Sequence, residues 1–135
     1  MTDGRWPSEA IPDGDHRFVR VHRQWLRKNG SVAPGFFKNR PDERTGAMST
    51  DWSKYSTPDE TRVRAKKPHD NAVGRLIVVD VRAIPEQAVV HTPIQNHPEL
   101  PDNRSHTDVQ GPKAETDLDI QDQFASICSI VLSVP

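Results

Sequence analysis

Twelve prolines and seven glycines interrupt this chain of 135 residues and limit how long any helix or strand can be. Proline fixes one backbone dihedral and removes an amide donor, so it is tolerated mainly at the ends of elements. Valine, isoleucine, leucine and phenylalanine together make about a fifth of the chain, near the lower edge for folded domains. We therefore expect one domain with a small core, short elements and long loops.

The clearest local pattern lies in the sequence STPDETRVRAKK. Thr57 suits a helix N-cap, Pro58 suits the first helical position, and Glu60 falls three residues after the cap. This pattern predicts a surface helix from about Pro58 to Ala65. A second helix is predicted over 114–127, because Ile120, Phe124 and Ile127 share one face of a helix.

Apolar and β-branched runs predict the strands. The sequence GRLIVVDVRAI predicts a strand over 74–84, and its continuous apolar run from Leu76 to Val79 is typical of a central strand that is covered on both faces. The remaining strands are predicted at 16–22, 47–52, 87–94, 105–111 and 128–134. Short connections between strands favour antiparallel pairing, so we predict an α+β fold with a small mixed or mainly antiparallel sheet and two helices. Residues 1–15 are predicted as a flexible, extended tail before a single domain over 16–135.

Charge and composition exclude several classes of protein. The net charge of −1 argues against a strongly basic nucleic-acid-binding protein and leaves no DNA-binding signature, although no acid lies between Arg17 and Arg40. The lone Cys128 permits no internal disulfide, and no apolar run reaches the length of a membrane span. We expect a cytoplasmic protein with no signal peptide and no cofactor, because glycine-rich phosphate loops and zinc-finger spacings are absent.

The candidate catalytic residues come from three separate segments. His22 and His106 are candidate acid and base, because histidine titrates near neutral pH, and Ser49 is a candidate hydrogen-bond donor. Three cations are candidate anion-binding residues: Arg20, Arg104 and Lys113. Strand alternation places His106 and Asp108 on one face and Val109 on the other, so we expect the two polar side chains to point away from the core.

Two other kinds of site were weighed from the same residues. His91, His106 and Asp108 are metal ligands by residue type, but no helical spacing brings two of them together, so we predict no metal site. Tryptophan is common at the centres of protein interfaces, and Trp6 in the predicted tail is the candidate contact with a protein partner.

The segments FVRVH, MSTDW and NRSHTDVQGPK resemble a group of short bacterial proteins with an Arg/His first strand, a Met-Ser-x-Asp segment and an Asn-x-x-His segment followed by Gly and Lys. The matching positions are Arg20, His22, Met48, Ser49, Asp51, Asn103, His106, Gly111 and Lys113. Arg20 and His22 stand one residue closer together than in that pattern. The group has no established activity, so the resemblance implies no function and draws attention only to these three segments.

Two functional hypotheses follow. In the first, the chain is an accessory module that binds a protein partner. In the second, it is a metal-independent enzyme that acts on RNA or a nucleotide, with His22 and His106 as acid and base. The enzyme hypothesis gains support if His22, Ser49 and His106 lie in one cleft, with Arg20 or Lys113 beside them.

Overall fold

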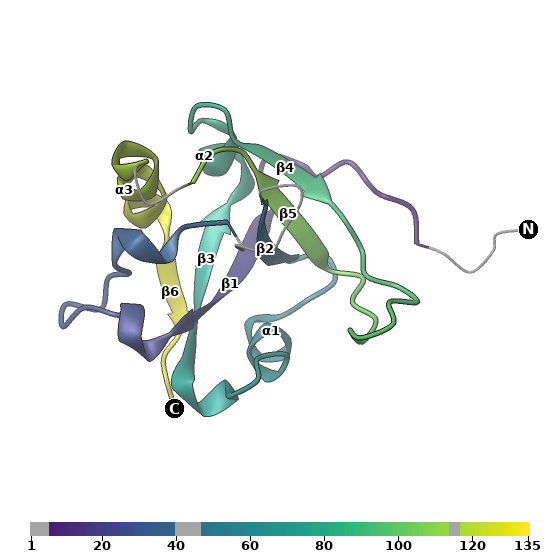
Figure 1. Ribbon diagram of the computed structural model, residues 1–135, viewed down its shortest axis with the longest axis horizontal. Coiled ribbons are helices and arrows are strands. Elements are labelled where there is room, and N and C mark those ends of the chain that lie inside the picture. Colours follow the sequence, from purple (N-terminus) through teal and green to yellow (C-terminus); the bar gives the residue numbers. More distant parts are fainter. Residues whose placement is uncertain (1–5, 40–46, 114–116) are drawn as a thin grey trace, which may run out of the picture.

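The computed structural model describes residues 6–39, 47–113 and 117–135, and Figure 1 shows its elements. The strands are β1 (His16–His22), β2 (Ala47–Trp52), β3 (Asn71–Ile77), β4 (Ala88–His91), β5 (His106–Gln110) and β6 (Ser129–Leu132). They form one antiparallel sheet in the order β4-β5-β2-β1-β3-β6. Together with three α-helices, this sheet confirms the predicted α+β fold.

Helix α1 (Pro58–Val63) has the predicted N-terminal cap. The Thr57 hydroxyl accepts a hydrogen bond from the Glu60 amide at 3.2 Å, and the Glu60 carboxylate accepts one from the Thr57 amide at 3.0 Å. These reciprocal bonds satisfy two amides at the start of the helix and fix where the chain turns. The second predicted helix is α3 (Leu118–Ile127), and three short 3₁₀ turns are η1 (Arg23–Trp25), η2 (Pro34–Phe36) and η3 (Pro68–Asp70).

The prediction of a strand over 74–84 is wrong beyond Ile77. Strand β3 stops at Ile77, and the valine-rich continuation forms a third helix, α2 (Val78–Arg82). The backbone carbonyls of Asp15 and Asp13 accept hydrogen bonds from the Val78 and Val79 amides, at 2.9 and 3.0 Å. Because these amides are already bonded, the chain turns into a helix that buries Val78 and Val81.

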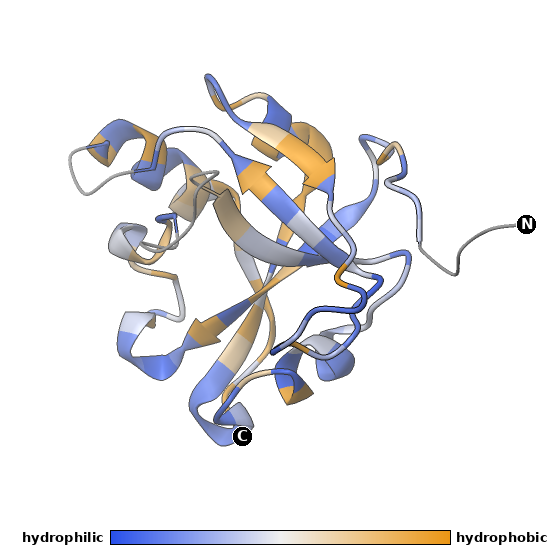
Figure 2. Cartoon of the chain, turned by 45° about the vertical axis from the view of Figure 1, so that its right-hand side comes forward, coloured by the Kyte–Doolittle hydropathy of each residue, from blue (hydrophilic) through white to orange (hydrophobic). Residues whose placement is uncertain are grey.

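The main core lies on the face of the sheet that carries Val19 and Val21. There the rings of Phe37 and Phe124 stack at 5.5 Å between centroids and join η2 to α3. In Figure 2 the hydrophobic colours gather in the strands and in the helix after β3, whereas the connecting loops are largely hydrophilic. Figure 1 shows α2 and α3 at one end of the sheet and α1 at the other.

Residues 6–15 have no regular secondary structure, as expected for a tail, but they lie against the folded domain. Ile11 is buried beside Trp52 and Val78. The Ser8 hydroxyl donates to the His91 carbonyl at 2.6 Å, and the Glu9 amide donates to His91 Nδ1 at 3.0 Å. The boundary expected at residue 16 therefore does not separate residues 6–15 from the domain, and residues 1–5 lie outside the described residues.

Candidate functional site

A cavity of about 620 Å³ lies between β1, β2 and the loop that precedes β5. Its size falls within the range of pockets that hold small-molecule ligands. It is lined by Phe18, Val19, Arg20, Phe36, Lys38, Asn39, Met48, Ser49, Thr50, Asp51, Arg64, Ile94, Leu100, Pro101, Asp102, Asn103 and His106. One part of the lining is apolar and the other carries charged and hydrogen-bonding groups.

The cavity lies where two neighbouring strands separate. Strands β1 and β2 are both fully described, and their pairing covers Arg17 with Trp52 and Phe18 with Asp51. By contrast, β1 pairs with β3 along its whole length, and β2 pairs with β5 from Ala47 to Asp51. Beyond Phe18 and Asp51 the two strands each keep their other neighbour, and the residues that follow line the cavity.

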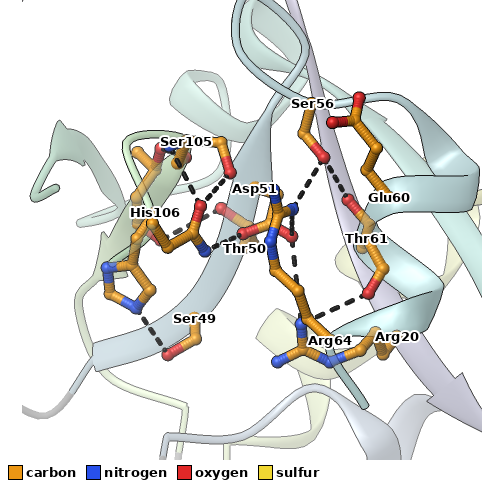
Figure 3. A network of polar contacts seen from close by, with 12 residues as sticks. Arg20, Ser49, Thr50, Asp51, Ser56, Glu60, Thr61, Arg64, Ser105 and His106 are labelled. Atoms are coloured by element: carbon orange, nitrogen blue, oxygen red, sulfur yellow. Dashed lines mark hydrogen bonds and ion pairs between the residues drawn. The ribbon is translucent and has the colours of Figure 1, made fainter. Parts of the chain in front are cut away.

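The carboxylate of Asp51 is the centre of the charged part. Its Oδ2 lies 2.9 Å from Arg64 Nη1 and 3.8 Å from Arg20 Nη1, and its Oδ1 accepts a hydrogen bond from Asn103 Nδ2 at 3.0 Å. Figure 3 shows the two arginines reaching Asp51 from different elements. Two cations against one buried carboxylate leave an excess of positive charge at this end of the cavity.

Burial and the two neighbouring charges all act on the pKa of Arg20, and not in the same direction. Burial lowers the pKa of Arg20, the Asp51 carboxylate raises it, and the neighbouring Arg64 lowers it. A guanidinium nevertheless stays protonated at physiological pH. Two partly desolvated cations side by side favour a site that an anion can occupy.

Ser49 and His106 form a hydrogen-bonded pair beside these cations (Figure 3). His106 Nδ1 lies 2.9 Å from the Thr92 carbonyl oxygen, which only accepts hydrogen bonds. The Thr92 hydroxyl lies 3.0 Å from the same nitrogen. In the tautomer that donates from Nδ1 to the carbonyl, Nε2 can accept the hydroxyl proton of Ser49, with 3.2 Å between Nε2 and Oγ. A nucleophile, a base and a group that orients the base are the parts that nucleophilic catalysis requires.

The structure thus brings three of the candidate residues into one cavity: Arg20, Ser49 and His106. His22 does not line this cavity. It ends β1, and its Nδ1 accepts a hydrogen bond from the Gln24 amide at 3.1 Å, which caps η1. Ser49, His106 and Arg20 therefore converge in one cavity, whereas the predicted pairing of His22 with His106 is absent from its lining.

Lys113 is not positioned as an exposed anion-binding residue. Its ammonium group is buried and donates to Gln87 Oε1 at 2.7 Å and to the carbonyls of Val109 and Gly111, both at 3.0 Å. These bonds hold the chain together after β5. Burial lowers the pKa of Lys113 to about 8, while Asp108 opposes that shift.

Arg104 and Trp6 lie beside the cavity wall and contact each other. The Arg104 guanidinium lies 4.4 Å from the Tyr55 ring centroid and 5.9 Å from that of Trp6. Its Nη2 lies 3.9 Å from a Glu9 carboxylate oxygen. Both side chains are therefore engaged within the chain, where a guanidinium between aromatic rings is stabilised by cation–π attraction.

His106 and Asp108 lie on the opposite face of β5 from the core residue Val109, as the alternation predicts, but the expectation that this face is exposed is wrong. Their exposures are 9% and 8%, because β5 lies between β2 and β4 and residues 92–105 cover its end. His106 Nε2 also lies 3.9 Å from Asp108 Oδ1. Both faces of β5 are thus covered, and His106 on the polar face is part of the cavity wall.

Sequence reasoning missed Arg64 as a site residue. The capped helix α1 was expected to be a surface element, and Arg64 follows it directly as the C-cap residue. From there Nη1 reaches both Asp51 and Ser56, at 2.9 and 2.8 Å. The run of basic residues from Arg62 to Lys67 was visible in the sequence, but no local signal shows which of them faces β2.

Metal binding and nucleophilic cysteine chemistry both depend on where the histidine, acidic and cysteine side chains lie. Among the described residues, no group of three or more His, Cys, Asp or Glu side chains is arranged to hold a metal ion. His91 uses both ring nitrogens within the chain, with Glu9 at Nδ1 and the Arg104 carbonyl 2.7 Å from Nε2. Burial raises the pKa of Cys128 to about 12, which suppresses the thiolate that a nucleophilic cysteine requires.

The N-terminal segment holds the loop that forms one wall of the cavity. The Trp6 amide donates to Gln95 Oε1 at 2.7 Å, near the start of this loop, and Glu9 contacts Arg104 near its end. Within the loop, Ile94 and Asn103 exchange two backbone hydrogen bonds, at 2.9 and 2.8 Å. Asn103 is therefore fixed where its side chain meets Asp51.

No protein-family model, no curated protein and no solved structure matches this chain. In the described part of the chain, no helix is both long and apolar enough to cross a membrane. The resemblance to short bacterial proteins stays a prediction.

Proposed function

We propose that this protein is a metal-independent enzyme that acts on a phosphate ester of a nucleotide or RNA, with Ser49 as nucleophile and His106 as acid and base. The observation that carries this proposal is the arrangement of the Ser49–His106 pair and the two arginines around one cavity. His106 alone replaces the pair of histidines expected from the sequence, because His22 does not line the cavity.

The arginines are suited to hold a phosphoryl group. Within the described residues, Arg20 and Arg64 contact other protein groups through Nη1 alone. Their Nη2 and Nε donors remain for a ligand, and guanidinium groups bind phosphate oxygens in a planar, bidentate manner. Asp51 orients both side chains, and because an ionised carboxylate only accepts hydrogen bonds, it has no donor to offer a phosphoryl oxygen.

The apolar part of the cavity supports a planar group beside the phosphate. Phe18, Phe36 and Ile94 line it, with Leu100 and Pro101 from the loop before β5. A nucleobase is planar and stacks on aromatic side chains at a gain of about 1–3 kcal/mol per base. A volume of about 620 Å³ is suited to a ligand of the size of one nucleotide.

The reaction proceeds in two steps, and in each step His106 first takes a proton and then gives it up. Ser49 Oγ attacks phosphorus and its proton passes to His106 Nε2, while the ester P–O bond breaks. The imidazolium then gives that proton to the leaving oxygen. A water molecule then attacks phosphorus while His106 takes its proton, the bond between phosphorus and Ser49 Oγ breaks, and His106 returns that proton to Ser49 Oγ, which frees the phosphate. The positive charge of Arg20 and Arg64 stabilises the developing charge on the phosphoryl oxygens.

The test is turnover of a short RNA and of mononucleotide esters in the presence of a chelator. His106→Gln is expected to slow turnover by roughly 10²–10⁴-fold, the usual contribution of acid–base catalysis. Ser49→Ala is expected to abolish formation of a phosphorylated protein, which mass spectrometry detects. His69→Gln and Ser126→Ala are matched controls, since both positions are exposed and lie outside the cavity lining. Equal rates for His106→Gln and His69→Gln would refute the proposal.

The interaction-module hypothesis has weaker support. It depends on Trp6 as the contact with a partner, and Trp6 packs against Arg104 within the chain. A protein partner that binds through Trp6 would have to displace that contact. A cytoplasmic location stays a prediction and is supported by the single, unreactive Cys128.

A further inference from the structure

A group of exposed cations continues from the cavity along the chain after β1. Arg23, Arg27 and Lys28 are exposed, and Lys38 is exposed at the cavity itself. We call these four residues the basic surface. The net charge of −1 gives no indication of this surface, because the acids of the other segments offset its positive charge. No acid occurs between Arg17 and Arg40.

The basic surface is continuous with the cavity through Trp25. Lys38 Nζ lies 5.3 Å from the Trp25 ring centroid, and Trp25 belongs to η1 together with Arg23. The next residues are held by backbone bonds, since the Arg27 amide donates to the Ser31 carbonyl at 2.9 Å. Figure 1 shows this segment directly after β1, at the end of the sheet away from α2.

One acid faces this surface from a neighbouring element. Asp70 of η3 lies 3.5 Å from Arg23 Nη2. The side chains of Arg27 and Lys28 have no partner among the residues that the structure describes. Arg27, Lys28 and Lys38, which are three of the four cations, are therefore available to an anionic ligand that is larger than the cavity.

We infer that the substrate is a single-stranded RNA chain, of which one nucleotide enters the cavity while the adjoining phosphates lie along the basic surface. This inference rests on the proposed function. Grooves that bind single-stranded nucleic acid combine cations that follow the backbone with aromatic rings beside them, as Trp25 and Lys38 do. RNA is favoured because proteins recognise RNA chiefly through its single-stranded loops and ends, where the bases are splayed out.

The test measures binding in the His106→Gln background, so that the oligonucleotide is not consumed. A fluorescent oligoribonucleotide of about eight nucleotides, within the usual site size, is titrated at several salt concentrations and compared with a mononucleotide. Three phosphate contacts predict a slope of log K against log salt of about −2, and a loss of about 0.7 from that slope in Arg27→Ala. Mononucleotide affinity is expected to be the same with and without that substitution.

Arg82→Ala is the matched control, because it removes one exposed cation from α2, outside the cavity lining. Equal affinity for the oligonucleotide and the mononucleotide would refute the extended site alone, as would equal effects of Arg27→Ala and Arg82→Ala. Equal binding of DNA of the same sequence would refute the assignment to RNA. A mononucleotide that fails to bind would instead refute the proposed function.

Discussion

At the scale of single residues, the chain buries two cations away from the cavity. Arg17 is fully buried, and none of its guanidinium nitrogens has a hydrogen-bond partner among the described residues. Burial lowers the pKa of Arg17 to about 9, against the attraction of Asp108 and Asp51. Lys113 is buried with three hydrogen bonds. Desolvated cations destabilise the folded state where their attraction to acids and their hydrogen bonds do not offset burial.

Lys113 makes stability depend on alkaline pH. Burial lowers its pKa from 10.5 to about 8, so between these values the unfolded chain binds more protons than the folded one. Lys113 therefore makes a contribution to the free energy of unfolding that rises with pH across this interval, by at most about 3 kcal/mol, while Cys128 with its raised pKa acts in the opposite direction in all the proteins compared. Urea denaturation from pH 7 to 10 measures this rise, and Lys113→Met is expected to reduce it.

The control for Lys113 is Lys67→Met, which removes an exposed lysine and keeps the rise. The contribution of Arg17 is common to all three proteins and cancels in the comparison. A rise of the same size in Lys113→Met would show that this lysine is not the titrating group.

At the scale of elements, β3 is packed closely against both β1 and the end of α3. A Cβ added at Gly74 would lie 2.6 Å from Cys128 Sγ and 3.2 Å from Val19 Cγ2. The first distance is too short for any real contact, so glycine is required here by space. The pairing of β3 with β6 shifts register next to this residue, between Val73 and Gly74.

Gly74→Ala is expected to lower the free energy of unfolding by about 1–3 kcal/mol, as overpacking of a core usually does. Cys128→Ala in the same chain removes the sulfur and is expected to restore part of this loss. Gly14→Ala is the control, since no atom lies within 4 Å of its added Cβ. Chemical denaturation of the parent, both single variants at positions 74 and 128 and the double variant measures the coupling, and strictly additive losses would contradict the close contact.

At the scale of the whole molecule, the N-terminal segment and the sheet form one folded unit. Residues 6–9 bond to His91 and Gln95, and Ile11 packs beside Trp52 and Val78. Because these contacts also hold the wall of the cavity, the segment is expected to unfold together with the sheet. Small domains of this kind unfold in a single cooperative transition.

Tryptophan fluorescence and far-UV circular dichroism are therefore expected to give the same midpoint in urea. The chain has three tryptophans, and Trp6→Phe isolates the signal of the N-terminal one by difference. An earlier transition that is present in the parent protein and absent in Trp6→Phe would show that the segment detaches before the sheet unfolds.

The positions of most strands and of helices α1 and α3 could be predicted from the sequence, because they depend on neighbouring residues. The cap at Thr57 with Pro58 and Glu60, and the alternation in β1 and β5, are local patterns that act through the backbone. Ser49, His106 and Arg20 were chosen for their residue type alone. That choice did not indicate which of them would meet, and His22 and Lys113 were chosen on the same grounds.

The tertiary structure decided the end of β3, the burial of the polar face of β5 and the composition of the cavity. Ser49 and His106 are 57 positions apart and become neighbours only because β2 pairs with β5. Arg64 reaches Asp51 because α1 packs against β1 and because β1 separates from β2 beyond Phe18. Local patterns determine the conformation of each segment. The contacts in the cavity depend instead on strand order and loop packing, which the sequence of one segment does not determine.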